Sequence, residues 1–138
     1  MAEAKHREGA DIYEGEVALE KAASLLEDSG LPGGLLPLKN VIEAGHVKET
    51  GYVWIRQEEE IEHVFKQVGR PVKYGTEIKA FIEKGRLRDL SGVKSKEMLL
   101  WVPINDISVP STAPNKVAFR SIGGLGKMFK KEAFERGQ

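Results

Sequence analysis

The chain has 138 residues, of which 41% are hydrophobic, and this length and composition suit one globular domain. It contains no cysteine, which excludes disulfides and thiolate chemistry and fits a reducing compartment. The 21 basic and 21 acidic residues cancel, which argues against a general nucleic-acid binder. The polar N-terminus is not typical of a signal peptide, and no apolar run approaches about 20 residues. We therefore expect a cytoplasmic monomer with no transmembrane segment and no nucleic-acid partner.

The chain is predicted to begin with a flexible arm and then form its one helix. Residues 1–13 are polar and mixed in charge, so we expect them to form the arm. From Glu16 to Ser29 apolar residues recur on one helical stripe, and a glycine and a proline directly beyond it stop the helix. Residues 14–138 are predicted to form a single β-barrel-like domain.

The loop of residues 31–37 follows the predicted helix and reads Leu-Pro-Gly-Gly-Leu-Leu-Pro. Its prolines and glycines prevent regular structure, yet it carries three leucines. Because so much apolar surface must dock on something, the loop is either a lid over one end of the core or the rim of an apolar ligand site. In the second interpretation, Leu35 and Leu36 contact the ligand.

Beyond this loop the hydrophobic period changes to that of strands. The longest alternation runs from Val72 to Glu83, and Gly75 within it indicates a bulge or a sharp bend. Turn-forming residues separate about seven or eight short strands in all. The predicted fold class is therefore mainly β with one N-terminal helix: an antiparallel β-barrel or half-barrel with the helix packed against it.

The most apolar segment is Met-Leu-Leu-Trp-Val at residues 98–102. Since apolar residues stand at adjacent positions, we expect a central strand that is buried on both faces. Residues 90–93 before it, Leu-Ser-Gly-Val, are predicted to form a turn with Gly92 at a positive φ.

No motif specifies a catalytic or metal site. The Gly-x-Ser-x-Gly pentapeptide of serine hydrolases is absent, and no histidine lies near Ser91 in the sequence. His46 and His63 lie on predicted strands without compact metal-ligand spacing, so we predict neither a metal nor a cofactor.

Two carboxylates, Glu77 and Glu97, interrupt apolar strand patterns. An unpaired buried carboxylate is costly, so we expect both to be exposed or paired with Arg86, Arg88 or Lys96. A catalytic carboxylate is the alternative interpretation.

Aromatic residues, among them Trp54, Tyr74 and Trp101, could line the inside of the barrel. Small barrels are usually filled by their own side chains, so a packed core is the first interpretation of these rings. A cavity for an apolar ligand is the second.

Several motifs, taken in their order along the chain, resemble one known family. They are LPGGLLP at 31–37, TGYVW at 50–54, YGTEI at 74–78, LSGVKSKE at 90–97, GL at 124–125, Phe129 and AF at 133–134. The chain is similar over nearly its whole length to the plant domain-of-unknown-function family 538, and looks like its branch without a secretion signal or cysteines. The resemblance implies a β-barrel-like plant protein, with roles in stress or growth, in binding lipid-like molecules or in chlorophyll hydrolysis.

Three functions remain open from the sequence. The first is a non-enzymatic binding module for an apolar or amphipathic small molecule, lipid-like or pigment-like, through Leu35, Leu36, Trp54, Tyr74 and Trp101. The second is an esterase-type hydrolase acting on chlorophyll or lipid esters through Ser91, Glu77 or His63. The third is a protein-interaction module without a small ligand.

Overall fold

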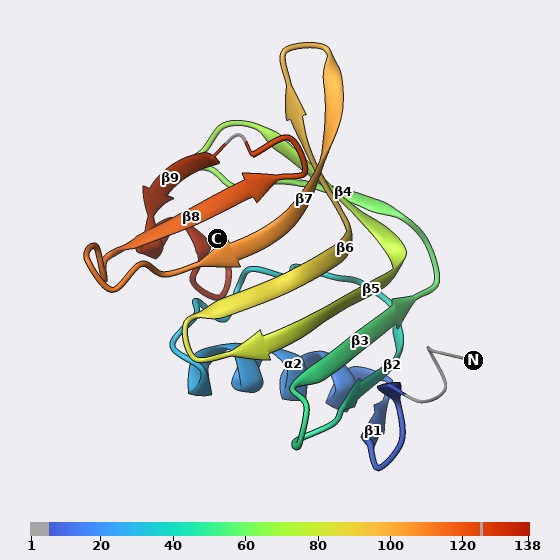
Figure 1. Ribbon diagram of the computed structural model, residues 1–138. Coiled ribbons are helices and arrows are strands. Elements are labelled where there is room, and N and C mark those ends of the chain that lie inside the picture. Colours follow the sequence, from blue (N-terminus) through green and yellow to red (C-terminus); the bar gives the residue numbers. More distant parts are fainter. Residues whose placement is uncertain (1–5, 125) are drawn as a thin grey trace.

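The computed structural model describes residues 6–124 and 126–138, which form a curled sheet with one α-helix packed against it (Figure 1). The strands are β1 (Asp11–Glu14), β2 (Val41–His46), β3 (Tyr52–Gln57), β4 (Ile61–Val64), β5 (Pro71–Glu83), β6 (Arg86–Glu97), β7 (Leu100–Ser108), β8 (Lys116–Ser121) and β9 (Gly126–Lys130). Helix α2 (Glu16–Asp28) follows β1, and the 3-10 helix η1 (Lys131–Phe134) follows β9. The predicted fold class, mainly β with one N-terminal helix, is confirmed. No helix within the described ranges is long and apolar enough to span a bilayer.

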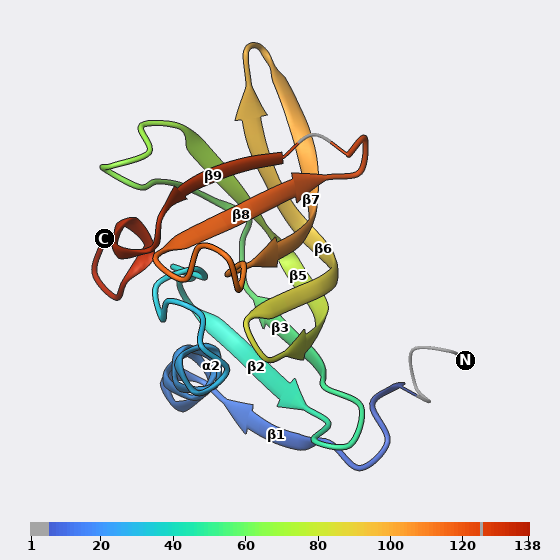
Figure 2. The same ribbon diagram turned by 60° about the vertical axis from the view of Figure 1, so that its left-hand side comes forward.

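The strands pair antiparallel in the order β1-β2-β3-β5-β6-β7-β8-β9, and β4 pairs with the first part of β5. Strands β1 and β9 are the edges, and no pairing within the described residues joins them, so the sheet is an open half-barrel (Figures 1 and 2). Of the two predicted architectures, barrel and half-barrel, the structure has the half-barrel. The sheet has nine strands where about seven or eight were expected, because β1 lies in the predicted arm.

The described part of the predicted arm is docked on the sheet instead of being free. Strand β1 pairs with β2, with Ile12 opposite Gly45. Upstream of it, the His6 ring lies edge-on to Tyr52 and Phe81 on the outer face of the sheet. The sequence did not indicate this docking, because these residues are polar and show no apolar period. Pairing at a sheet edge uses backbone groups, and the contact of His6 uses a single ring, so neither needs such a period. Residues 1–5 of the predicted arm lie outside the described residues.

Two facing glycines allow β5 and β6 to bend where the sheet curls. Gly92 has a φ of 91°, and a Cβ there would overlap the carbonyl oxygen of Glu77 on β5. Gly75 lies opposite, where the register between β5 and β6 shifts. The irregularity predicted at Gly75 is confirmed. The turn predicted at residues 90–93 is wrong, because this stretch continues along β6 and uses its positive φ for a bend.

The main hydrophobic core lies between α2, the loop of residues 31–37 and the inner face of the sheet. Ala18 and Leu26 of the helix and Leu31 and Leu35 of the loop are almost completely buried in it. The Tyr74 hydroxyl donates a hydrogen bond of 2.8 Å to the carbonyl of Leu35, which fixes the loop on β5. The loop is thus a lid over the core, as the first of its two interpretations predicted.

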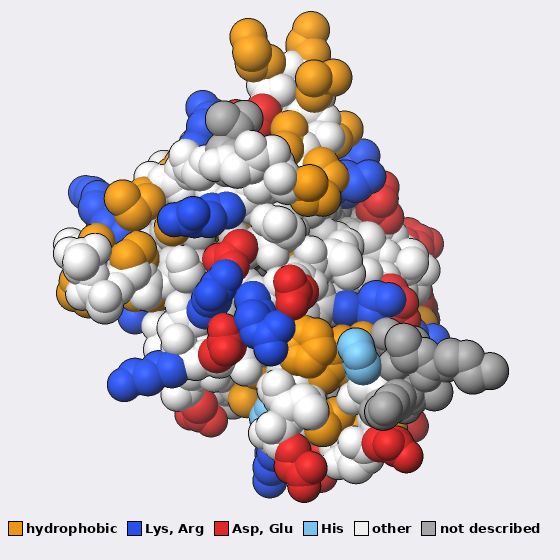
Figure 3. Space-filling model, in the orientation of Figure 1, with side chains coloured by type: hydrophobic (Ala, Val, Ile, Leu, Met, Phe, Trp, Pro, Cys, Tyr) orange, Lys and Arg blue, Asp and Glu red, His pale blue; other side chains and the backbone are white. Residues whose placement is uncertain are grey.

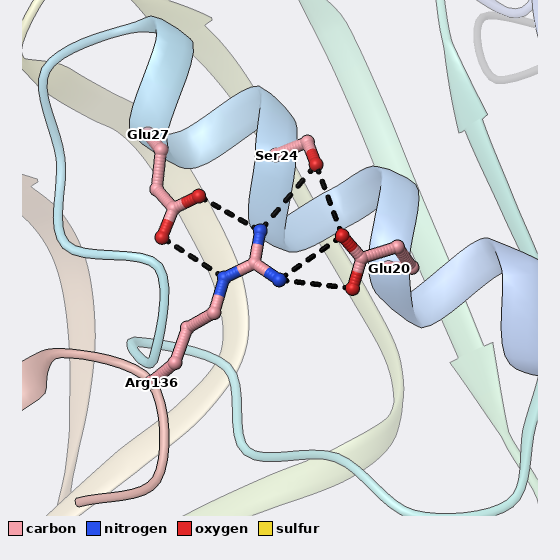
Figure 4. A network of polar contacts seen from close by, with 4 residues as sticks. All are labelled: Glu20, Ser24, Glu27 and Arg136. Carbon is pink, nitrogen blue, oxygen red and sulfur yellow. Dashed lines mark hydrogen bonds and ion pairs between the residues drawn. The ribbon is translucent and has the colours of Figure 1, made fainter.

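The C-terminal tail is tied to helix α2 by one guanidinium group (Figure 4). Arg136 donates to both carboxylates of Glu20 and Glu27, over 2.7 to 3.0 Å, and contacts the Ser24 hydroxyl at 3.4 Å. These three residues lie one turn apart on the exposed side of the helix, so their spacing matches the fork of the guanidinium. The network holds the tail that follows η1 against the helix.

The apolar segment at residues 98–102 is the tip of the hairpin formed by β6 and β7, and the predicted central strand is wrong. Met98, Leu99 and Leu100 are 94%, 88% and 71% exposed. The hairpin extends past the body of the sheet, so its tip has no neighbouring strand or helix to cover it (Figures 1 and 3). Adjacent apolar residues indicate burial only where the fold supplies neighbours on both faces, and here it supplies none.

Candidate functional site

An apolar groove of about 470 Å³ lies between the open edge at β9 and the connection from β4 to β5. Val68 and Val72 line it on the β4–β5 side, and Val102 and Ile104 line it from β7. These strands converge there because the sheet curls without closing. A volume of this size falls in the range of about 300 to 1,000 Å³ that small-molecule sites occupy.

The floor of the groove is a cluster of aromatic rings. Phe134 of η1 lies 5.0 Å from the Phe119 ring on β8, 6.1 Å from the Phe129 ring on β9 and 4.8 Å from the Phe65 ring. The rings of Phe65 and Phe129 meet Phe134 nearly edge-on, an arrangement that fixes them against one another. Phe119, Phe129 and Phe134 contribute to the wall of the groove, which is therefore rigid and apolar.

Two cations and one carboxylate stand at the rim of this groove. Glu97, at the end of β6, accepts hydrogen bonds at one oxygen, Oε2, from Arg70 at 2.7 Å and from Lys127 at 2.6 Å. Burial raises the pKa of Glu97, but the hydrogen bonds and charges of Lys127 and Arg70 outweigh it and hold the pKa below its ordinary value. The carboxylate stays ionised at neutral pH, and the rim keeps one net positive charge.

A second cavity, of about 210 Å³, lies between α2 and the sheet. Leu25 of the helix, Leu36 of the lid, and Ala44 and Trp54 of the sheet border it. Its volume is below the usual range for small-molecule sites. The groove at β9 is therefore the better candidate for a ligand with a long apolar body.

The five residues predicted to bind a ligand do not come together. Leu36 and Trp54 border the smaller cavity, whereas Leu35 and Tyr74 are buried in the core. Burial raises the pKa of the Tyr74 hydroxyl, whose hydrogen bond to the lid is structural. Trp101 lies on the hairpin, where Lys73 and Lys96 stand 4.2 and 5.7 Å from its ring.

Trp54 is held in place by contacts that are structural. Its indole Nε1 donates a hydrogen bond of 2.7 Å to Glu43, and this bond lowers the pKa of the Glu43 carboxyl. The guanidinium of Arg7 lies 4.3 Å from the ring centroid, in cation–π contact. Gly45 on the neighbouring strand leaves room for the ring, because a Cβ there would overlap it.

The three residues considered for hydrolysis are engaged elsewhere or apart. His63 on β4 contacts the Gln138 carbonyl at 2.8 Å through Nε2. Glu77 on β5 accepts from Arg7 at 3.2 Å, and Ser91 is exposed on β6 opposite Lys79. No hydrogen bond links these three side chains to one another within the described ranges. Nor does that part of the chain contain a cluster of acidic or histidine side chains that could hold a metal.

The residues that form the groove were missed because they come from segments far apart in the sequence. One of them did carry a signal: Glu97 interrupts an apolar pattern, and an ion pair was predicted for it. The pair exists, but with Arg70 and Lys127 in place of Arg86, Arg88 or Lys96. Likewise Glu77 pairs with Arg7 and Lys79. The chosen partners were near in sequence, and the actual ones are near only in the fold.

Comparison with known proteins identified a family. The model of the family described as "Protein of unknown function, DUF538" matches residues 22–135, which is most of the chain. No curated protein and no solved structure matched.

Proposed function

Because the chain belongs to the DUF538 family, whose description assigns no activity, we propose from the geometry that it is a non-enzymatic binding module for an amphipathic small molecule. The observation that supports this is the groove itself: about 470 Å³ of mainly apolar wall with two cations at one end. A lipid-like or pigment-like molecule with an apolar body and an anionic head has the matching shape.

The apolar body of the ligand lies against the aromatic floor and displaces water from it. Each buried methylene adds about 0.8 kcal/mol, or roughly fourfold in affinity. Chain length should therefore dominate the affinity until the groove is full.

The anionic head of the ligand takes the place of Glu97 beside Arg70 and Lys127. Since the pKa of Glu97 is lowered, the head competes with an ionised carboxylate for the same two cations. Exchange of one anion for another leaves the charge balance of the rim nearly unchanged. The head thus orients the ligand and adds little affinity, which suits reversible binding.

The arrangement of Ser91, Glu77 and His63 does not support the hydrolase alternative. The protein-interaction alternative would concern the exposed tip of the β6–β7 hairpin, which is treated below. A role in stress or growth rests on the resemblance alone and stays a prediction. The plant origin, the cytoplasmic location, the monomeric state and the single-domain boundary at residue 14 also stay predictions.

The test is a titration of the protein with saturated fatty acids of increasing chain length, followed by calorimetry. The affinity should rise about fourfold per methylene. Val102→Asp, which places a carboxylate in the groove, should abolish binding, and the same change at exposed Val64 on β4 should not. An affinity independent of chain length, or equal binding by both variants, would exclude this groove as the site.

A further inference from the structure

The hairpin of β6 and β7 presents three consecutive apolar side chains to solvent. Met98, Leu99 and Leu100 form its tip, and the turn after Ser121 adds Ile122, which is 70% exposed. Ser121 pairs with Ile104 on β7, so this turn lies beside the hairpin (Figures 1 and 2). In Figure 3 the hydrophobic side chains at the hairpin stand clear of the rest of the surface. A chain that folds in water rarely gathers so much apolar surface at one projecting point without a use for it.

The backbone conformation of the tip also indicates a function for its apolar residues. Met98 has a φ of 57°, in the left-handed region where glycine and asparagine are the favoured residues. A long apolar side chain occupies a position where a small or polar one would fold more easily. The tip is therefore better suited to contact something apolar than to form a stable turn.

Basic residues outnumber acidic ones at the end of the molecule that carries the tip. The segments at this end of the molecule are residues 60–73, which include β4 and the start of β5, residues 94–102, and residues 121–124 and 126–128. They contain six basic residues and three acidic residues, a net charge of +3. The basic residues are Lys66, Arg70, Lys73, Lys94, Lys96 and Lys127. Because the whole chain is neutral, the remainder carries the opposite excess. Lys73 also has an acidic neighbour in Glu60, at 3.8 Å.

Trp101 marks the boundary between the apolar tip and the basic residues. Trp101 follows Leu100 in the chain, and the ammonium groups of Lys73 and Lys96 lie 4.2 and 5.7 Å from the centroid of its ring. Tryptophan with flanking lysines is typical of the level of lipid headgroups, where the ring lies in the interface and the cations meet phosphates.

We propose that this end of the molecule docks on an anionic lipid bilayer. Met98, Leu99 and Leu100 enter the boundary between headgroups and acyl chains, Trp101 lies at headgroup level, and the lysines meet the negative surface. A narrow projecting tip offers little area to a protein partner, which needs about 800 Å² on each side. A bilayer needs no complementary shape, so a narrow apolar tip with lysines beside it fits a bilayer better.

The proposal is independent of the amphipathic ligand, although the two surfaces are adjacent. Met98 and Leu100 also contribute to the lining of the groove, so docking would bring its mouth to the membrane. Leu99 and Ile122 do not line it, which allows the two functions to be tested separately.

The test is co-sedimentation with vesicles of phosphatidylcholine alone and of phosphatidylcholine mixed with phosphatidylserine. The protein should sediment with the anionic vesicles, less so as salt rises. Leu99→Ser with Ile122→Ser should weaken binding at least about tenfold. The control pair, Ile12→Ser with Val17→Ser, removes apolar side chains that are 55% and 56% exposed on the opposite part of the molecule, and should have no effect.

Three further variants separate the contributions. Lys94→Gln with Lys96→Gln should weaken binding roughly tenfold, and Lys48→Gln with Lys84→Gln, the same loss of charge away from the hairpin, should not. Met98→Asn should keep or raise the melting temperature and yet weaken vesicle binding.

Several results would overturn the proposal. They are absence of binding to the anionic vesicles, equal binding by the Leu99 and Ile122 double variant, and tip-dependent self-association of a protein that ignores vesicles. Fatty-acid binding that persists in this double variant, and vesicle binding that persists in Val102→Asp, would show that groove and docking surface act independently.

Discussion

Glu43 and Trp54 form the most sharply defined polar contact on the outer face of the sheet. The indole donates to the carboxylate at 2.7 Å, and Arg56 adds an ion pair at 3.3 Å. The hydrogen bond from Trp54 is the main cause of the lowered pKa of Glu43, with Arg56 and Arg7 adding to it against a smaller effect of burial. The pair stabilises the position of β2 against β3, where Gly45 leaves space for the ring.

Glu43→Gln is predicted to lower the free energy of unfolding at neutral pH by about 1 kcal/mol, because a charge-assisted hydrogen bond becomes a neutral one. Folding lowers the pKa of Glu43, so its contribution is complete above the ordinary value of 4.5 and disappears as the pH falls through the folded value. Denaturant unfolding of both proteins from neutral to acid pH should show the difference closing.

The control for this prediction is Glu49→Gln, an exposed carboxylate in the neighbouring turn. It should leave the stability unchanged over the same pH range. A difference between wild type and Glu43→Gln that persists in acid would show that packing, and not the charge, is what Glu43 contributes.

At the scale of single elements, the bend of β5 and β6 decides the shape of the sheet. Strand β5 pairs with β3 along its second half and with β4 along its first, so it crosses from one part of the curl to the other. The glycines at 75 and 92 stand where the register shifts. Without the bend, the walls of the groove would not face each other.

Gly92→Ala is predicted to destabilise the fold by at least about 2 kcal/mol, since the new Cβ meets the Glu77 carbonyl and the backbone has a positive φ. Gly75→Ala is its matched control, because a Cβ there meets nothing nearer than the Gly92 carbonyl oxygen at 3.5 Å, an ordinary contact. Chemical denaturation of both variants measures the difference. Equal losses would mean that the bend does not depend on Gly92.

The contact between the C-terminal tail and α2 depends on Arg136. Its pKa is raised by hydrogen bonds with Glu27 and Glu20, but all three groups are exposed, so salt should screen the network. Arg136→Gln is predicted to speed hydrogen exchange of the Gly34 amide, which donates to the Phe134 carbonyl at 2.8 Å, with little change in the melting temperature. High salt should have the same effect on the wild type.

Lys130→Gln, a nearby loss of charge outside the network, should leave that exchange rate unchanged. If the Gly34 amide exchanges equally fast in wild type and Arg136→Gln, the tail is held by the packing of Phe134 alone.

At the scale of the whole molecule, the hydrophobic period of the sequence predicted the regular elements and not how the sheet ends. The stripe of α2 and the alternation of β5 were visible in the sequence because each is repeated over several residues. The open edge of the sheet was not, because it depends on where β1 and β9 end in space. The net charge of the whole chain gave no sign of the charge distribution, because a neutral chain carries a positive excess at one end once distant segments meet.

The candidate site was the least predictable part. Leu35 is a predicted ligand contact because it lies in the apolar loop, and Tyr74 because aromatic residues could line a barrel, but the same apolar character suits the core, and both side chains are buried there. The groove instead uses side chains from the β4–β5 connection, from five strands and from η1, with no shared local pattern. Among them Glu97 had a signal as a charge in an apolar stretch, although its partners could be identified only from the fold. Residues 98–102 also had a signal as the most apolar segment, but it indicated a buried strand and not the wall of a groove.

The measurement that tests the central claim most directly is an amide NMR titration of the protein with palmitate. Binding in the groove predicts saturable shifts at Val68, Val102 and Phe129 and none around Leu25 and Ala44 beside the smaller cavity. Shifts confined to the smaller cavity, or no saturable shifts at all, would contradict the account of the groove as the ligand site.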